Sequence, residues 1–130
     1  MAASSSQYGE CMTEAMTEES LFELLSLECR VDGTGTLRYY DALGQLHRIH
    51  GPAVVRSNGN RAWWQNGLRH RVDGPAIVYA DGCRAWFQNG RRHRIDGPAI
   101  EYPDGSKFWY INGKELTEAE WRQVASMETV

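Results

Sequence analysis

A 23-residue repeat is the sequence feature that most constrains the fold. Glycines recur at this interval at positions 51, 74 and 97, and each begins a Gly-Pro-Ala triplet. Tryptophans recur at the same interval, at positions 63, 86 and 109. Because a repeat dictates one architecture for all its copies, we expect residues 38–60, 61–83 and 84–106 to form equivalent units. A partial fourth unit runs from residue 107 to about residue 116.

The units 61–83 and 84–106 each contain two turn dipeptides flanked by β-forming residues, and the first and the partial fourth unit contain one each. Asp81-Gly82 and Asn89-Gly90 are examples, and the others are Asn58-Gly59, Asn66-Gly67, Asp104-Gly105 and Asn112-Gly113. Both residues of a type I′ turn have positive φ, which Asn, Asp and Gly tolerate best. Two such turns per repeat predict a mainly β fold, an antiparallel meander of about seven short strands from near Leu37 to near Leu116.

The turns also predict which side chains share a face of the sheet. Counting back from two-residue turns places Trp86 opposite both Ile77 and His93, and Phe87 opposite Arg92. We expect the isoleucine–tryptophan–histidine face to be the core and the aromatic–arginine face to be the working surface. A one-residue bulge would exchange the two faces.

The charges divide the chain into three parts. Residues 1–30 hold six acids and one arginine, residues 31–114 hold twelve basic and seven acidic side chains, and residues 115–130 hold four glutamates and one arginine. An acidic head and tail therefore flank a basic repeat region. We expect a disordered acidic tail over 1–16, an amphipathic helix over 17–30, a repeat β-sheet domain over 31–116, and a C-terminal helix and tail over 117–130.

Both flanking helices carry recognisable signals. Thr17 is a candidate N-cap for the first helix, and Thr117 with Glu120 forms a capping box for the second, which is expected from about Glu118 to Ser126. Leu116 and Trp121 are placed for the hydrophobic staple across that cap.

The first helix is too apolar for an isolated surface helix. Its apolar side chains are expected to bury against the sheet or against a second copy of the chain, as a homodimer contact: Leu21, Phe22, Leu24 and Leu25.

Cysteine usage and hydropathy predict a cytoplasmic protein. Cys11, Cys29 and Cys83 have unrelated spacings, which favours reduced thiols over a disulfide framework or a metal site. No apolar run approaches the ~20 residues that span a bilayer, and the N-terminus lacks the pattern of a secretory signal. We expect no membrane partner.

The recurring polar residues favour a scaffold over an enzyme. His70, Asp73, His93 and Asp96 are candidates for chemistry, but equivalent positions two strands apart are separated by about 10 Å. Residues spaced in this way form a row rather than one site, and histidines that far apart cannot share a zinc ion. We therefore expect no catalytic residue, no metal and no cofactor.

The strings WWQNGLRHRVDGPAIVYADG and WFQNGRRHRIDGPAIEYPDG resemble a repeat of small proteins from bacteriophages, some bacteria and large DNA viruses. This repeat is loosely similar to MORN-type β-hairpin repeats. The resemblance covers about 80 of the 130 residues, and the first unit departs from it, with His50 in place of aspartate. It implies a β-hairpin fold and a viral or mobile-element setting, without an activity.

These observations favour a non-enzymatic protein-binding module, expected to bind and inhibit or remodel a host protein complex such as a defence complex. The candidate partner-binding residues are Trp64, Arg69, Arg71, Phe87, Arg92, Arg94 and Tyr110. The alternative is a nucleic-acid-binding protein in which arginines contact phosphates and aromatic rings stack on bases. The net charge of −3 gives little long-range attraction to a polyanion, which weakens this alternative.

Overall fold

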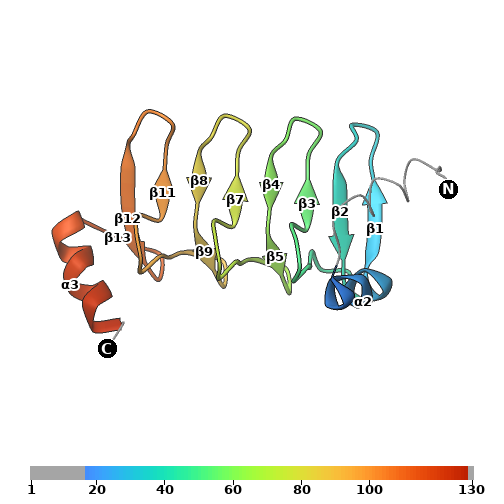
Figure 1. The fold of residues 1–130 in the computed structure, drawn as a ribbon, viewed down its shortest axis with the longest axis horizontal. Helices are drawn as coiled ribbons and strands as arrows, with labels where there is room; N and C mark the ends of the chain where they lie inside the picture. The colour runs from blue at the N-terminus through green and yellow to red at the C-terminus, as the bar shows by residue number, and fades with distance from the viewer. Residues whose placement is uncertain (1–16, 129–130) are drawn as a thin grey trace.

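The computed structural model describes residues 17–128, which form a nine-stranded antiparallel sheet, two small hairpins and two helices (Figure 1). The main sheet contains, in spatial order, β1 (Glu28–Val31), β2 (Leu37–Tyr40), β3 (Val54–Val55), β4 (Arg61–Ala62), β7 (Ile77–Val78), β8 (Arg84–Ala85), β11 (Ile100–Glu101), β12 (Lys107–Ile111) and β13 (Lys114–Leu116). The small hairpins are β5 (Trp64–Gln65) with β6 (Leu68–Arg69), and β9 (Phe87–Gln88) with β10 (Arg91–Arg92). The helices are α2 (Glu18–Ser26) and α3 (Glu118–Glu128).

The predicted mainly β class with an antiparallel sheet and two short helices is confirmed. The main sheet has nine strands instead of about seven, because β1 adds a strand before Leu37 and eight strands follow between Leu37 and Leu116. The chain leaves the main sheet after β4 and again after β8. At each of these points it forms a small hairpin at the lower edge of Figure 1 before returning. The expected tail over 1–16 lies outside the described residues.

The two kinds of turn dipeptide form different turns. Asn66, Asn89 and Asn112 have φ values of 53°, 53° and 51°, and the glycine after each is also positive, as predicted for type I′ turns. At Asp81-Gly82 only the glycine has positive φ. Gly82 N donates to Tyr79 O at 3.0 Å and Tyr79 N donates to Cys83 O at 2.9 Å. This turn is therefore a three-residue loop with a bulge, and the type I′ prediction is wrong here.

The bulge shifts the register of the main sheet by one residue. Ile77 lies opposite Ala85 and not opposite Trp86, so the predicted isoleucine–tryptophan–histidine core row is wrong. The small hairpin does have the predicted register, with Phe87 opposite Arg92. Phe87 follows Ala85 by two residues and shares its face, which brings this ring into the core.

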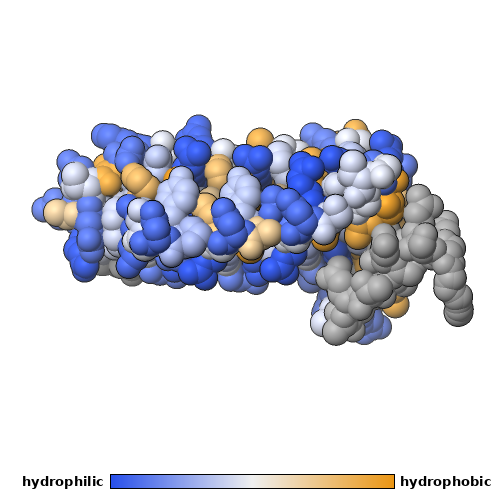
Figure 2. Space-filling view, turned by 90° about the horizontal axis from the view of Figure 1, so that it is seen from above, coloured by the Kyte–Doolittle hydropathy of each residue, from blue (hydrophilic) through white to orange (hydrophobic). Residues whose placement is uncertain are grey.

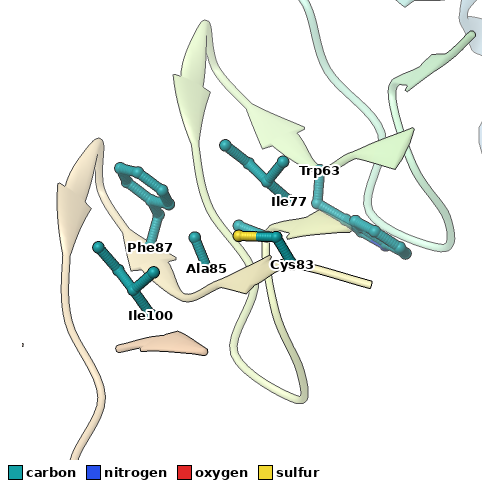
Figure 3. Packing of buried hydrophobic residues seen from close by; sticks show 7 residues of the cluster. Trp63, Ile77, Cys83, Ala85, Phe87 and Ile100 are labelled. Carbon is teal, nitrogen blue, oxygen red and sulfur yellow. The ribbon is translucent and has the colours of Figure 1, made fainter. Parts of the chain in front are cut away.

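The central core forms on the face that the bulge selects. Its buried members are Trp63, Ala76, Ile77, Cys83, Ala85, Phe87 and Ile100 (Figure 3). Only 8% of the Phe87 surface is exposed, and Ala76 is fully buried. Burying a side chain such as Ile77 or Phe87 contributes about 1.5–3 kcal/mol, so these central residues hold the sheet together without a covering helix layer.

Helix α2 lies at one end of the sheet, beside β1 and β2 (Figure 1). It ends at Ser26, within the 17–30 range expected for it, and residues 28–31 of the chain form β1 instead. The Glu23 carboxylate accepts the backbone N–H groups of Ile49 and His50. This contact fixes the helix to the first repeat unit.

Helix α3 closes the opposite end. The predicted capping box is present, since Glu120 N donates to Thr117 Oγ1 at 3.1 Å and Thr117 N donates to Glu120 Oε1 at 2.9 Å. Trp121 is buried against Leu116 and Trp109, and its indole Nε1 donates to Arg94 O at 2.7 Å. In the described part of the chain, neither helix is long and apolar enough to cross a membrane.

Candidate functional site

The seven predicted partner-binding residues lie in two separate rows. In the first row, arginines alternate with aromatic rings. The Arg69 guanidinium carbon is 5.1 Å from the Trp64 ring centroid and 5.6 Å from that of Phe87. The Arg92 guanidinium carbon is 5.8 Å from the Phe87 centroid and 5.4 Å from that of Tyr110. We call this row the alternating ladder.

The small hairpins build the alternating ladder. Trp64 lies opposite Arg69, and Phe87 lies opposite Arg92, because the Asn-Gly turns fix the register of each hairpin. Consecutive units are joined by backbone hydrogen bonds, for example from Gly90 N to Arg69 O at 2.8 Å. Each arginine is thereby held between the ring of its own unit and the ring of the next.

The arginines of the alternating ladder have no carboxylate partner in the described part of the chain. Arg69 and Arg92 are exposed, whereas Trp64 and Tyr110 are half-buried and Phe87 is in the core. Contacts with aromatic faces restrict the guanidinium groups and contribute about 0.5–1 kcal/mol each at exposed sites. The row therefore presents two positioned cations to solvent. The buried Phe87 ring contacts both guanidinium groups but offers little surface to a partner.

The second row places arginines over a ring of β2 and over the tryptophans that directly follow β4 and β8, and we call it the paired ladder. Arg48, Arg71 and Arg94 lie 4.4, 4.0 and 3.8 Å from the ring centroids of Tyr39, Trp63 and Trp86. Arg71 and Arg94 also contact the aspartate two residues later, at 3.0 and 2.8 Å. Each arginine of the row donates to a proline carbonyl, at Pro52, Pro75 or Pro98.

The paired ladder explains the glycine of each Gly-Pro pair. A Cβ atom at Gly97 would lie 2.5 Å from the Arg94 guanidinium carbon, and one at Gly74 would lie 2.8 Å from that of Arg71. Only glycine lets these half-buried arginines lie against the backbone. Arg71 and Arg94 are therefore occupied in holding the fold, which separates them from the exposed arginines of the alternating ladder.

The repeated histidines connect neighbouring units. The Nδ1 atoms of His47, His70 and His93 each accept a hydrogen bond at 3.0 Å from the backbone N–H of the Asn-Gly turn in the following unit, at Asn66, Asn89 and Asn112. An acceptor at Nδ1 places the proton of the neutral ring at Nε2. Among the described residues, no group of three or more His, Cys, Asp or Glu side chains could hold a metal ion.

A cavity of about 210 Å³ lies at one end of the alternating ladder, at the junction of the first two units. Arg38 and Arg56, which the sequence reasoning missed, line it together with Arg61 and Arg69. Arg38 is also the ion-pair partner of Asp32. The Thr34 hydroxyl and the Arg38 guanidinium hold the pKa of Asp32 well below its usual range. Arg56 could have been found from the sequence, because the 23-residue interval places tyrosines, Tyr79 and Tyr102, at its position in later units. Arg38 carries no such signal, because the same interval aligns it with Arg61.

The cysteines do not behave alike. Cys83 is a free thiol in the core, and burial, together with the charge of Asp81, raises its pKa. Cys29 is disulfide-bonded, so the expectation of three reduced thiols is wrong for this residue.

The apolar residues of α2 differ in their exposure. Phe22 and Leu25 are 66% and 74% exposed, Leu21 is 39% exposed, and Leu24 is half-buried. Elsewhere, the face seen in Figure 2 is mainly hydrophilic, with small and separate hydrophobic patches.

Comparison with known proteins gives no relative. No known protein family, no curated protein and no solved structure matches this chain.

Proposed function

We propose that this protein is a non-enzymatic binding module whose alternating ladder engages an acidic surface of a partner protein. The observation that carries this proposal is the pair of exposed arginines, Arg69 and Arg92, held between aromatic rings without a carboxylate partner among the described residues. Arginine and aromatic side chains are the usual anchors of protein interfaces. A positioned guanidinium also binds a carboxylate with less loss of side-chain entropy.

The repeated polar residues support a scaffold role. His70 and His93 accept hydrogen bonds from the next unit, and Asp73 and Asp96 pair with the arginines of the paired ladder. Each of these groups is occupied in the same way once per unit. An arrangement that recurs along the sheet in this way serves to extend a surface.

The proposed setting is the cytoplasm of a host cell, where the protein would inhibit or remodel a host complex such as a defence complex. Only the resemblance to repeat proteins of phages and large DNA viruses supports this part of the proposal. The disulfide at Cys29 is the observation against a reducing compartment. The location is tested by alkylating free thiols during purification and then titrating the thiols that remain. If Cys29 is not alkylated because it is in a disulfide, the result would contradict a cytoplasmic location.

A capture experiment with matched charge changes tests the protein-binding function. The tagged protein is incubated with nuclease-treated host lysate, beside a variant with Arg69→Glu and Arg92→Glu and a control with Arg122→Glu on α3. We expect one stoichiometric protein to bind the wild type and the control, and to be lost with the double variant. Equal recovery with all three proteins would contradict the role of the alternating ladder.

Nucleic-acid binding is the second candidate function. The alternation of Trp64, Phe87 and Tyr110 with arginines is the observation that favours it, because bases stack on rings while guanidinium groups contact phosphates. This function requires affinity for a single-stranded oligonucleotide that falls steeply with salt and is lost in the Arg69 and Arg92 double variant. Absence of such affinity at low salt leaves the protein-binding function.

We also propose that the protein forms a homodimer through α2. Phe22 and Leu25 are large apolar side chains with most of their surface exposed, and burial against a second copy would remove this surface from water. Light scattering of the wild type and of a Leu24→Ser, Leu25→Ser variant tests the contact. A wild type that is a monomer at all concentrations would exclude it.

A further inference from the structure

The arginine-lined cavity at the first junction differs from the rest of the sheet in its charge. Four arginines and no acidic residue line it. Val54 and Ile77, each only 6% exposed, and Trp64 also line it.

The later units act as an internal reference for this cavity. Strand pairing places Arg38 opposite Val54, in the same way as Ala62 lies opposite Ile77 and Ala85 lies opposite Ile100. The position of Arg56, two residues after Val54, is held by Tyr79 and Tyr102 in the next two units. An alanine and a tyrosine at the second and third junctions thus correspond to two arginines at the first. The repeat itself requires neither arginine, because the equivalent positions in the later units are uncharged.

The charge of the cavity is only partly balanced. Arg38 Nη1 pairs with Asp32 Oδ2 at 2.7 Å. No carboxylate of the described residues lies within ion-pair distance of Arg56, Arg61 or Arg69. Arg61 lies opposite Val55 and Val78, so its side chain points to the other face of the sheet from Val54 and Ile77. Arg56 and Arg69 are therefore the unpaired cations of the cavity, and together with Arg38 they define a site for an anion with more than one negative charge.

We propose that this cavity binds a phosphomonoester dianion attached to a small aromatic group. The planar guanidinium fork matches the oxygens of a phosphate, and several forks can share its three terminal oxygens. Val54, Ile77 and the Trp64 ring supply the surface for the aromatic group. A volume of about 210 Å³ is below the ~300–1,000 Å³ typical of drug-sized ligands, which selects a single phosphorylated group over a large cofactor.

This inference deepens the proposed function and rests on it in one respect, since Arg69 belongs both to the alternating ladder and to the cavity. It assigns to this end of the ladder a phosphorylated group and not only a general acidic surface. The cavity and the alternating ladder share Arg69 but otherwise depend on different arginines. Arg56 lines only the cavity, and Arg92 lies only in the ladder.

Calorimetric titration of the full chain with phenyl phosphate at low salt tests the site. The variants are Arg56→Tyr and Arg38→Ala, which install the residues of the equivalent positions in the next unit, and Arg92→Ala is the matched control. We expect binding to the wild type and the control, and at least tenfold weaker binding to each cavity variant. Circular dichroism melting verifies that all variants fold. We expect the two cavity variants to fold, because the residues they introduce already occupy the equivalent positions in the next unit.

Two further probes identify the chemistry. Inorganic phosphate is expected to bind more weakly than phenyl phosphate, and benzoate, with a single negative charge, more weakly than either. Failure of phenyl phosphate to bind the wild type at millimolar concentration would overturn the proposal, as would equal binding by Arg56→Tyr. The titration needs no host partner, so its outcome is independent of the capture experiment. Loss of a captured partner in the Arg69 and Arg92 double variant tests the alternating ladder, whereas loss of phenyl phosphate binding in Arg56→Tyr tests the cavity.

Discussion

Trp121 packs on Trp109 with their ring centroids 4.5 Å apart and an interplanar angle of 47°. Trp109 continues the row of rings formed by Trp63 and Trp86, each of which is covered by an arginine of the paired ladder. At the last ring, the indole of α3 takes the place of the guanidinium. The helix therefore ends the array by covering the exposed face of its final ring.

Replacing Trp121 by alanine should destabilise the protein more than any other single change in α3. The side chain is 8% exposed and fills the space between the helix and the last unit, and truncation of a buried tryptophan costs about 3–5 kcal/mol. Trp121→Phe keeps a ring but loses the hydrogen bond to Arg94 O, at a cost of about 1 kcal/mol. Urea unfolding followed by circular dichroism measures both, and an unchanged midpoint for the alanine variant would contradict the capping role.

Removing the His70 imidazole should open one contact between units without disturbing the next. His70→Ala leaves the Asn89 N–H without its acceptor, and loss of one such hydrogen bond costs about 1 kcal/mol. We expect faster amide hydrogen exchange at Asn89. The Asn112 amide, which donates to His93, provides the control within the same molecule. Equal acceleration at both amides would indicate global destabilisation instead.

Substitutions at Asn89 should depend on backbone conformation more than on size. The residue has a φ of 53°, a left-handed conformation that costs most residues other than glycine, asparagine and aspartate about 1–2 kcal/mol. Asn89→Ala should lower the free energy of unfolding by about this amount, whereas Asn89→Gly should change it by less. Thermal unfolding of the two variants compares them, and an alanine variant as stable as the glycine variant would sink the argument.

Cys83 should react slowly and should make stability depend on alkaline pH. Burial raises the pKa of its thiol, so the folded state holds the proton at pH values where the unfolded chain loses it. The stabilisation is complete below the ordinary pKa of a thiol and is lost as pH rises through the raised value. Ellman's reagent at pH 8 should label Cys83 much faster in denaturant than in buffer, with Cys83→Ala as the blank. Equal rates would mean that the thiol is accessible.

Sequence reasoning succeeded where a feature depends on neighbouring residues. The Asn89-Gly90 turn and the Thr117–Glu120 capping box both follow local rules, and the structure contains them as predicted. The Asp81-Gly82 turn did not follow its rule, since the Asp81 carboxylate accepts the Cys83 N–H at 2.9 Å and stabilises a longer loop. This one-residue difference places Ala85, and not Trp86, opposite Ile77.

The candidate site depended on features that a constant repeat interval hides. An offset of 23 residues aligns Arg38 with Arg61, but the loop of the first unit is one residue longer. Strand pairing equates Arg38 with Ala62, which reveals it as a departure from the repeat. Similarly, the histidine contacts join residues 19 positions apart and belong to no local motif.

The hydrogen bonds between units have a consequence for how such a chain can evolve. Deletion of residues 61–83 would join Asn60 to Arg84 and present the N–H of Asn89 to the Nδ1 of His47, reproducing the contact that Asn66 makes now. Insertion of another copy of residues 61–83 would lengthen the array by one unit and add one more contact between a histidine and the turn of the next unit. Because each unit interacts mainly with its neighbours, the array can be lengthened or shortened by recombination in whole steps, and the reach of its binding face is then set by the number of copies between two fixed ends.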